Sequence, residues 1–158
     1  MAKRFSILTK NELSALAKKL AAKVLKLSKG NNARLISLSG ELGGGKTTFT
    51  QFFAKALGVR GRVLSPTFVV AHEHPIAKKS PYRRLIHIDA YRIDGKKFFD
   101  STEIRRYLTN PENIVVIEWG ERISKWIPKS DVTMHLQHYK SRYRKVCVIS
   151  KFKNQNGK

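Results

Sequence analysis

The chain has 158 residues, of which 41% are hydrophobic and 27% charged, as expected for a globular protein that buries its own core. No apolar run approaches the ~20 residues that cross a bilayer, so we expect no membrane association and no secretory signal in Met1-Ala2-Lys3-Arg4-Phe5. A single cysteine, Cys147, excludes an internal disulfide and favours a reducing, cytoplasmic location.

The formal net charge of +21 is concentrated toward both ends of the chain. Eight Lys and Arg residues precede Arg34 against one acid, and no acid follows Asp131, whereas eight acids match eight bases from Asp89 to Asp131. A polyanion such as RNA would explain the basic ends through phosphate neutralisation. A lysine-rich composition that serves solubility explains them equally well.

The first predicted element is a helix that runs to about Leu27. Thr9-Lys10-Asn11-Glu12 has the form of a capping box, with Thr9 as N-cap and the Glu12 side chain bonded back to it. Apolar residues then recur at helical spacing, and Gly30-Asn31-Asn32 ends the pattern.

The next segment carries the most informative motif, Gly40-Glu41-Leu42-Gly43-Gly44-Gly45-Lys46-Thr47, which fits the phosphate-loop pattern G-x-x-x-x-G-K-[ST]. Its glycines let successive N–H groups point at one anion, Lys46 can reach the β- and γ-phosphates, and the Thr47 hydroxyl can bind Mg²⁺. A buried strand, 35–39, precedes the loop and a helix, 47–57, follows it, with Gly58 as a C-cap. Strand, loop and helix form the context that this motif requires.

The rest of the chain predicts further strands and one short helix. We expect an extended segment over 68–71, a polar loop over 75–82, a helix over 101–108 capped by Asp100 or Ser101, and strands over 84–89 and 114–117. Alternating residues over 132–139 and 144–152 predict a closing hairpin. Together these elements indicate a three-layer α/β domain over residues 1–158, with a basic, frayed tail at about 153–158.

Two predicted strands end in an acid, Asp89 and Glu118, and ligands bind at the carboxyl ends of strands in open α/β sheets. Either acid could serve as the metal-side carboxylate that a phosphate loop needs. Thr67 could contact the γ-phosphate or the metal, Arg92 could stabilise phosphate charge, and Trp119 could line the site. His87 alternates with core residues, which favours a structural role.

The nucleotide is predicted to be ATP. Guanine recognition usually requires an Asn/Thr-Lys-x-Asp motif, and the nearest stretch, Pro128-Lys129-Ser130-Asp131, lacks the leading Asn or Thr.

With these motifs assembled, the chain resembles the bacterial TsaE family, also called YjeE, of ATPases in tRNA threonylcarbamoyladenosine biosynthesis. The resemblance covers about residues 5 to 150 and lies in four ordered motifs: Gly40 to Thr48, Ser65-Pro66-Thr67-Phe68, His87-Ile88-Asp89-Ala90-Tyr91-Arg92 and Ile117-Glu118-Trp119. Each motif is weak alone, but the ordered set is specific. Glu41 and Gly44 depart mildly from the family's usual residues.

The resemblance implies a P-loop NTPase fold with a largely parallel central sheet and flanking antiparallel strands. It implies an ATP site over Gly40 to Thr48 and Trp119, with Mg²⁺ on Thr47 and Glu118, and with Lys46, Asp89 and Thr67 as catalytic residues. It also implies that ATP hydrolysis, weak in the isolated protein, supports turnover by a partner complex of TsaB and TsaD. Transfer RNA would be contacted through these partners, or directly by the basic ends.

Two other functions stay open at this stage. A small-molecule kinase shares the phosphate loop but needs an acceptor pocket and usually an arginine lid, which Arg105 and Arg106 resemble only loosely. A basic RNA-binding protein without catalysis would bind RNA independently of Lys46 and ATP.

Overall fold

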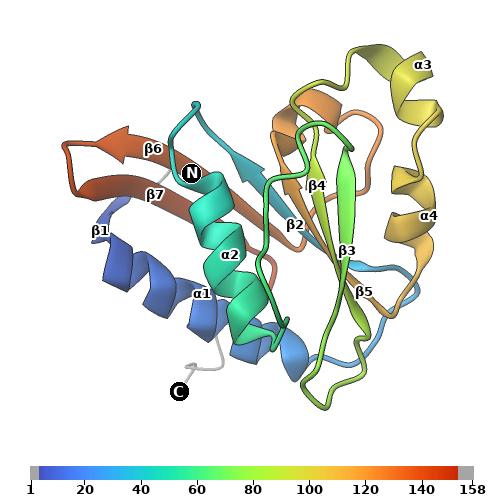
Figure 1. The fold of residues 1–158 in the computed structure, drawn as a ribbon, viewed down its shortest axis with the longest axis horizontal. Coiled ribbons are helices and arrows are strands. Elements are labelled where there is room, and N and C mark those ends of the chain that lie inside the picture. The colour runs from blue at the N-terminus through green and yellow to red at the C-terminus, as the bar shows by residue number, and fades with distance from the viewer. Residues whose placement is uncertain (1–3, 153–158) are drawn as a thin grey trace.

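A computed structural model describes residues 4–152 of the chain, so the predicted tail at 153–158 lies outside the described residues (Figure 1). In chain order the elements are β1 (Ser6–Thr9), α1 (Lys10–Leu25), β2 (Arg34–Ser39), α2 (Lys46–Ala56), β3 (Ala71–Pro75), β4 (Arg84–Asp89), α3 (Gly95–Asp100), α4 (Ile104–Thr109), β5 (Asn113–Glu118), the 3₁₀ helix η1 (Gly120–Ile123), β6 (Val132–Tyr139) and β7 (Tyr143–Ser150). The alternation of strands and helices confirms the predicted α/β class.

One mixed sheet holds all the strands in the order β1-β7-β6-β2-β5-β4-β3. The neighbours β6, β2, β5 and β4 run parallel, while β7 and β1 on one side and β3 on the other join antiparallel. In this register Leu38 and Asp89 both lie beside Glu118. The ends of β4 and β5 therefore meet the start of the phosphate loop at one edge of the sheet.

Helices cover both faces of the sheet and create two separate cores. In Figure 1, α1 and α2 lie on one face, whereas α3 and α4 lie by the strands β4 and β5. The first core contains Phe49 and Phe53 of α2 packed on the inward side chains of β2 and β6. The second core joins β2, β4 and β5 to Phe99 and Ile104 of the other layer. Both faces of β4 and β5 are buried, which explains the continuous apolar run of β5.

The start of α1 confirms the capping box. The Glu12 N–H donates to Thr9 Oγ1 over 3.2 Å, and the Thr9 N–H donates to Glu12 Oε2 over 2.7 Å. These bonds satisfy donors that a helix N-terminus otherwise leaves without partners. Helix α1 ends at Leu25, two residues before the predicted end, because the last residues form a turn.

The predicted extended segment over 68–71 is wrong for most of its length. Val69 and Val70 both donate their N–H groups to the carbonyl of Pro66, which closes a turn, and the strand β3 begins only at Ala71. Val70 has φ +69°, a conformation that β-branched residues rarely adopt. The apolar pattern predicted a strand, but bonds from Ser65 and Thr67 to Asp89 stabilise the turn instead.

Three further differences concern short elements. The predicted helix over 101–108 begins later, at Ile104, with Glu103 rather than Asp100 or Ser101 at its N-cap position. Helix α3 and strand β1, of six and four residues, were not predicted because neither is long enough for a periodic pattern. The C-terminal hairpin is confirmed, and Cys147 is buried within it. Among the described helices, none has the length and hydropathy to cross a bilayer.

Candidate functional site: a phosphate loop beside two strand-end acids

The phosphate loop connects the end of β2 to the first turn of α2. Three of its glycines have φ angles in the left-handed region, +123° at Gly40, +75° at Gly43 and +105° at Gly45. Gly45 is the N-cap residue of α2, so the positive end of the helix dipole faces the loop. This is the strand, loop and helix arrangement that the motif predicted.

Gly40 is required by a close approach of the neighbouring strand. A Cβ atom on Gly40 would lie 1.9 Å from the carbonyl oxygen of Leu136 in β6, whereas one on Gly43 would meet nothing within 4 Å. A backbone oxygen of a central strand cannot move away without breaking the sheet, so the loop start fits only glycine.

We therefore expect Gly40→Ala to lower the free energy of unfolding by about 3 kcal/mol or more, through a clash and an unfavourable φ together. Gly43→Ala, which has a positive φ but no clash, should cost only about 1 kcal/mol. Urea unfolding followed by circular dichroism measures both variants, and equal losses would contradict the steric explanation.

Lys46 is 5% exposed, and its ammonium group is held by the loop itself. Nζ donates to the carbonyl oxygens of Gly40 and Glu41 over 2.7 and 2.8 Å, and it lies 3.9 Å from the centre of the Trp119 ring. Burial lowers the pKa of Lys46, and the negative charges of Glu118 and other nearby acids partly offset this effect. The ammonium is thus poorly hydrated and close to the space in front of the loop, as a phosphate ligand requires.

Thr47 and Glu118 face each other at the foot of the loop. Thr47 Oγ1 donates to Glu118 Oε2 over 2.8 Å, which brings together the two residues predicted to hold Mg²⁺. The other carboxylate oxygen, Oε1, lies 2.7 Å from Nε2 of His87, a fully buried ring on the neighbouring strand β4. The prediction treated His87 as structural, and the structure shows that it holds the Glu118 carboxylate in position.

Asp89 belongs to a second group of polar residues, at the end of the neighbouring strand β4 beside Glu118. Its Oδ2 accepts from Thr67 Oγ1 over 2.8 Å and from Ser65 Oγ over 3.2 Å, while Oδ1 accepts from the Tyr91 N–H over 2.9 Å. Asp89 is 5% exposed, so these bonds compensate for the burial of its charge. No bond joins Asp89 to Glu118 among the described residues, and each acid therefore has its own set of partners.

A pocket of about 360 Å³ brings most of the predicted residues together. Its lining includes Leu42 to Thr48, Thr67, Asp89, Glu118 and Trp119. Two predicted ATP residues do not line it. The Glu41 side chain points to the β6–β7 hairpin, where Oε1 accepts from the His138 N–H over 3.0 Å. Gly40 also lies outside the lining and serves the loop through its conformation.

Arg92, Arg105 and Arg106 lie outside this pocket. Arg92 packs on the Phe68 ring with 4.6 Å between its guanidinium and the ring centre. Arg105 and Arg106 pair with Asp100 and Glu103 on the surface of the helical layer. This arrangement provides no arginine lid over the phosphate loop from these three residues.

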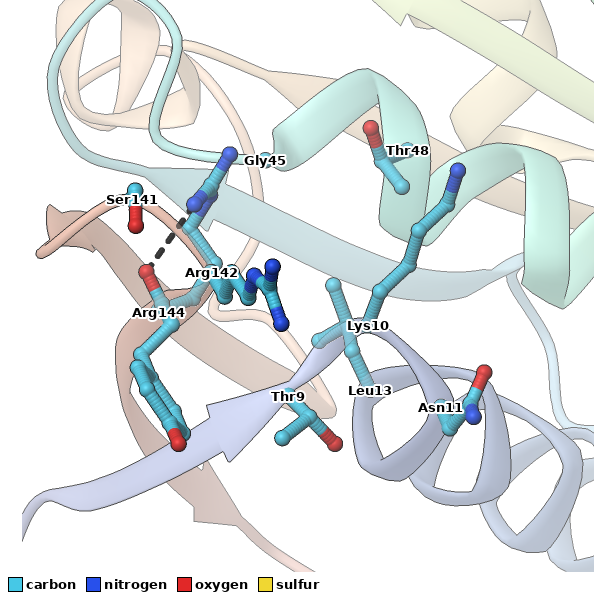
Figure 2. A pocket seen from close by; sticks show the side chains of 10 residues that line it. Thr9, Lys10, Asn11, Leu13, Gly45, Thr48, Ser141, Arg142 and Arg144 are labelled. Atoms are coloured by element: carbon cyan, nitrogen blue, oxygen red, sulfur yellow. Dashed lines mark hydrogen bonds between the residues drawn. The ribbon is translucent and has the colours of Figure 1, made fainter.

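A second pocket of about 550 Å³ adjoins the first at Gly45 and Thr48 (Figure 2). Figure 2 shows Arg142 and Arg144, from the β6–β7 hairpin, on one side and Lys10 and Asn11 of α1 on the other. Arg144 also lines the first pocket, and its side chain lies 3.5 Å from the place of a Cβ on Gly45. Arg142 and Arg144 were not predicted as site residues, because only the pairing of β7 with β1 and β6 brings them to the loop.

The residues in the first pocket fit a magnesium–nucleotide complex. Mg²⁺ is usually bound by one or two protein oxygens together with waters and substrate phosphates, and Thr47 and Glu118 supply two such oxygens. Within residues 4–152 no cluster of three or more His, Cys, Asp or Glu side chains could hold a metal without such help. The N–H donors of the loop and the ammonium of Lys46 match a multivalent anion, and the oxygens of Thr47 and Glu118 match a hard cation.

Comparison with known proteins decides the family. The family model described as "Threonylcarbamoyl adenosine biosynthesis protein TsaE" matches residues 7–146. The chain belongs to the TsaE family. This family acts in the biosynthesis of threonylcarbamoyladenosine in tRNA, as the sequence motifs predicted.

Individual relatives carry the name "tRNA threonylcarbamoyladenosine biosynthesis protein TsaE". The protein from Haemophilus influenzae is 35% identical over 77% of this chain and 73% of its own length. The protein from Aquifex aeolicus is 36% identical over 84% and 88%, respectively. The Streptomyces coelicolor protein is 45% identical over 55% of this chain, a match that spans only 57% of that protein.

A solved structure supports the fold. The crystal structure of YdiB from Bacillus subtilis superimposes with a TM-score of 0.66, covering 94% of this chain and 86% of the other at 24% identity. At this identity the likeness concerns the α/β fold alone.

Proposed function

We propose that this protein is the ATP-hydrolysing subunit of the machinery that forms N6-threonylcarbamoyladenosine in tRNA, and that it has a P-loop NTPase fold. The observation that carries the proposal is the contact of Thr47 Oγ1 with Glu118 Oε2 at 2.8 Å, beside Lys46 and inside a pocket lined by the phosphate loop. A metal-binding hydroxyl and a strand-end carboxylate in this position are the parts that phosphate-loop hydrolases use.

In this proposal the loop N–H groups and Lys46 bind the β- and γ-phosphates, and Thr47 with Glu118 holds Mg²⁺. The cation would neutralise phosphate charge as a Lewis acid. His87 orients Glu118 through its 2.7 Å bond, and Trp119 forms a wall against which Lys46 lies. The adjoining pocket, with Thr48, Arg142 and Arg144, offers space for the nucleoside.

Asp89 and Thr67 are assigned to the side where water attacks. In the reaction the oxygen of water bonds to the γ-phosphorus and the water gives up a proton to solvent, the bond from that phosphorus to the β,γ-bridging oxygen breaks, and ADP and inorganic phosphate leave. Asp89 would accept a hydrogen bond from the attacking water, and Thr67 would contact the γ-phosphate. The bond from Thr67 to Asp89 keeps both groups in place before the nucleotide binds.

The proposed partners are TsaB and TsaD, whose turnover the hydrolysis would support. Apolar side chains at the rim of the site favour a protein partner: Leu42 is 86% exposed, Phe68 83% and Val69 60%. Such residues are costly to leave in water, and a docking surface would cover them. Docking there would also enclose the pocket, which explains why we expect weak hydrolysis by the protein alone.

The deciding experiment measures phosphate release from ATP by the purified protein alone, with TsaB–TsaD, and with TsaB–TsaD and tRNA. We expect slow release alone and a stimulation of at least about tenfold by the complex, corresponding to about 1.4 kcal/mol in the barrier. A rate of phosphate release that does not change when the complex is added would contradict the subunit role. Transfer of phosphate to an added small molecule would favour a kinase instead.

A further inference from the structure

A basic surface lies at the end of the molecule opposite the phosphate loop. It comprises Lys26, Lys55, Arg60, Arg62, Lys78 and Lys79, and is here called the basic end. All six side chains are exposed, and within residues 4–152 none of them forms an ion pair or a side-chain hydrogen bond. The site described above uses none of them.

Three segments that are distant in sequence converge at this end. Figure 1 shows the C-terminal ends of α1 and α2 and the β3–β4 loop together at the lower side, while the phosphate loop lies above. A Cβ on Gly58 would lie 2.9 Å from Lys78 Cγ, so the loop after α2 touches the β3–β4 loop. The buried Tyr82 donates its hydroxyl to the Leu27 carbonyl over 3.2 Å and ties that loop to the end of α1. The segments that carry the six charges are therefore in contact with one another and form one surface.

Acids do not balance this charge. At the same edge of the sheet, Glu112 pairs with Lys29 at 3.3 Å and Asp131 pairs with Arg34 at 3.7 Å. Both acids thus already have a basic partner other than the six residues of the basic end. Repulsion among six uncompensated cations destabilises the folded chain, and an external polyanion would relieve it.

The composition of the surface favours RNA over a membrane. An interfacial amphipathic segment carries several large apolar side chains beside its lysines, but of the exposed large hydrophobic residues of the described chain only Leu64 lies within two residues of the segments 23–29, 55–62 and 76–84. Two of the six residues are arginines, which bind phosphate oxygens through two parallel N–H groups. Several cations without exposed aromatic side chains to stack on bases can bind the phosphate backbone of RNA, but they cannot read its base sequence.

We propose that the basic end binds the phosphate backbone of RNA, and that its ligand is the tRNA on which the modification machinery acts. The choice of tRNA rests on the proposed function, but the binding itself does not require ATP. Helix α2 separates the two sites, since its 11 residues place Lys55 roughly 14 Å from Lys46 along the helix axis. The proposal assigns the contact to this end of the fold, whereas the sequence had pointed to the two chain ends.

The test compares two quadruple variants in tRNA binding. The first changes Arg60→Gln, Arg62→Gln, Lys78→Gln and Lys79→Gln. The matched control removes the same charge from the other helical layer through Lys97→Gln, Arg105→Gln, Arg106→Gln and Lys125→Gln. Fluorescence anisotropy with an unmodified tRNA transcript, measured over a series of salt concentrations, gives the affinity and the salt slope.

We expect the first variant to bind tRNA at least about 30-fold more weakly at low salt, with the slope of log K against log salt reduced by about 3. The control should lose less than about threefold. Equal losses in both variants would overturn the proposal, because they would indicate a general charge effect. Binding of the wild-type protein to phosphatidylserine vesicles but not to tRNA would overturn it too.

Lys46→Ala separates this inference from the proposed function. This variant should bind tRNA like the wild-type protein, with or without ATP, even where ATP hydrolysis is lost. If Lys46→Ala abolished tRNA binding, the RNA contact would lie at the phosphate loop and the assignment to the basic end would be wrong. Circular dichroism melting confirms that each variant is folded.

Discussion

Lys46→Ala is expected to weaken ATP binding at least about 100-fold and to abolish measurable hydrolysis. The ammonium of Lys46 would make charge-assisted hydrogen bonds to two phosphates, each with a net effect of about 1.5–3 kcal/mol. A total of about 3 kcal/mol already corresponds to more than a hundredfold, at 1.4 kcal/mol per factor of ten. Because Nζ is largely buried beside Trp119, no surface lysine can replace it.

Isothermal titration with ATP and Mg²⁺ measures the affinity, and a phosphate-release assay measures the hydrolysis. Lys18→Ala is the matched control, because Lys18 is an exposed lysine of α1 outside both pockets. The control should keep both properties. If Lys46→Ala bound ATP normally, the loop N–H groups alone would suffice for binding, and the assignment of Lys46 would be wrong.

The phosphate loop could be predicted from the sequence because its chemistry depends on local residues. A glycine-rich turn, a lysine and a threonine must follow one another in the chain to surround one phosphate, so spacing alone reveals them. The position of Glu118 and Asp89 beside the loop could be predicted for a related reason, since each ends a buried strand and parallel strands end at one edge of the sheet. The contacts of these acids could not be predicted, because they depend on the register of β4 and β5.

Residues that reach the site from distant elements escaped the sequence analysis. Arg144 lies in a hairpin about one hundred residues after the loop, and nothing in its local pattern distinguishes it from other surface arginines. The turn at 66–70 was mistaken for a strand, because three apolar residues in a row outweighed a turn signal that consists of side-chain bonds to Asp89. The basic end could not be predicted either, because segments that are distant in the sequence supply its charge.

The second large effect is expected at Glu118. Glu118→Ala should lower Mg²⁺-dependent ATP turnover by about 100-fold, since the carboxylate is one of two protein oxygens proposed to hold the cation. Affinity for ATP without Mg²⁺ should stay within about threefold or increase, because the substitution also removes a negative charge near the phosphates. A variant that lost its fold would lose both turnover and ATP affinity. A loss of turnover alone therefore indicates a role for Glu118 in binding the cation.

Glu118→Gln gives a stricter version of the same test, because an amide can still contact Thr47 and His87 while it lacks the charge. We expect it to fold like the wild-type protein and to need a much higher Mg²⁺ concentration for turnover. Asp89→Asn is the counterpart at the neighbouring strand end, and it should lower turnover while the Mg²⁺ dependence stays unchanged. If Asp89→Asn altered the Mg²⁺ requirement and Glu118→Gln did not, Asp89 would be the metal acid, and the pairing of Thr47 with Glu118 would be only a structural hydrogen bond.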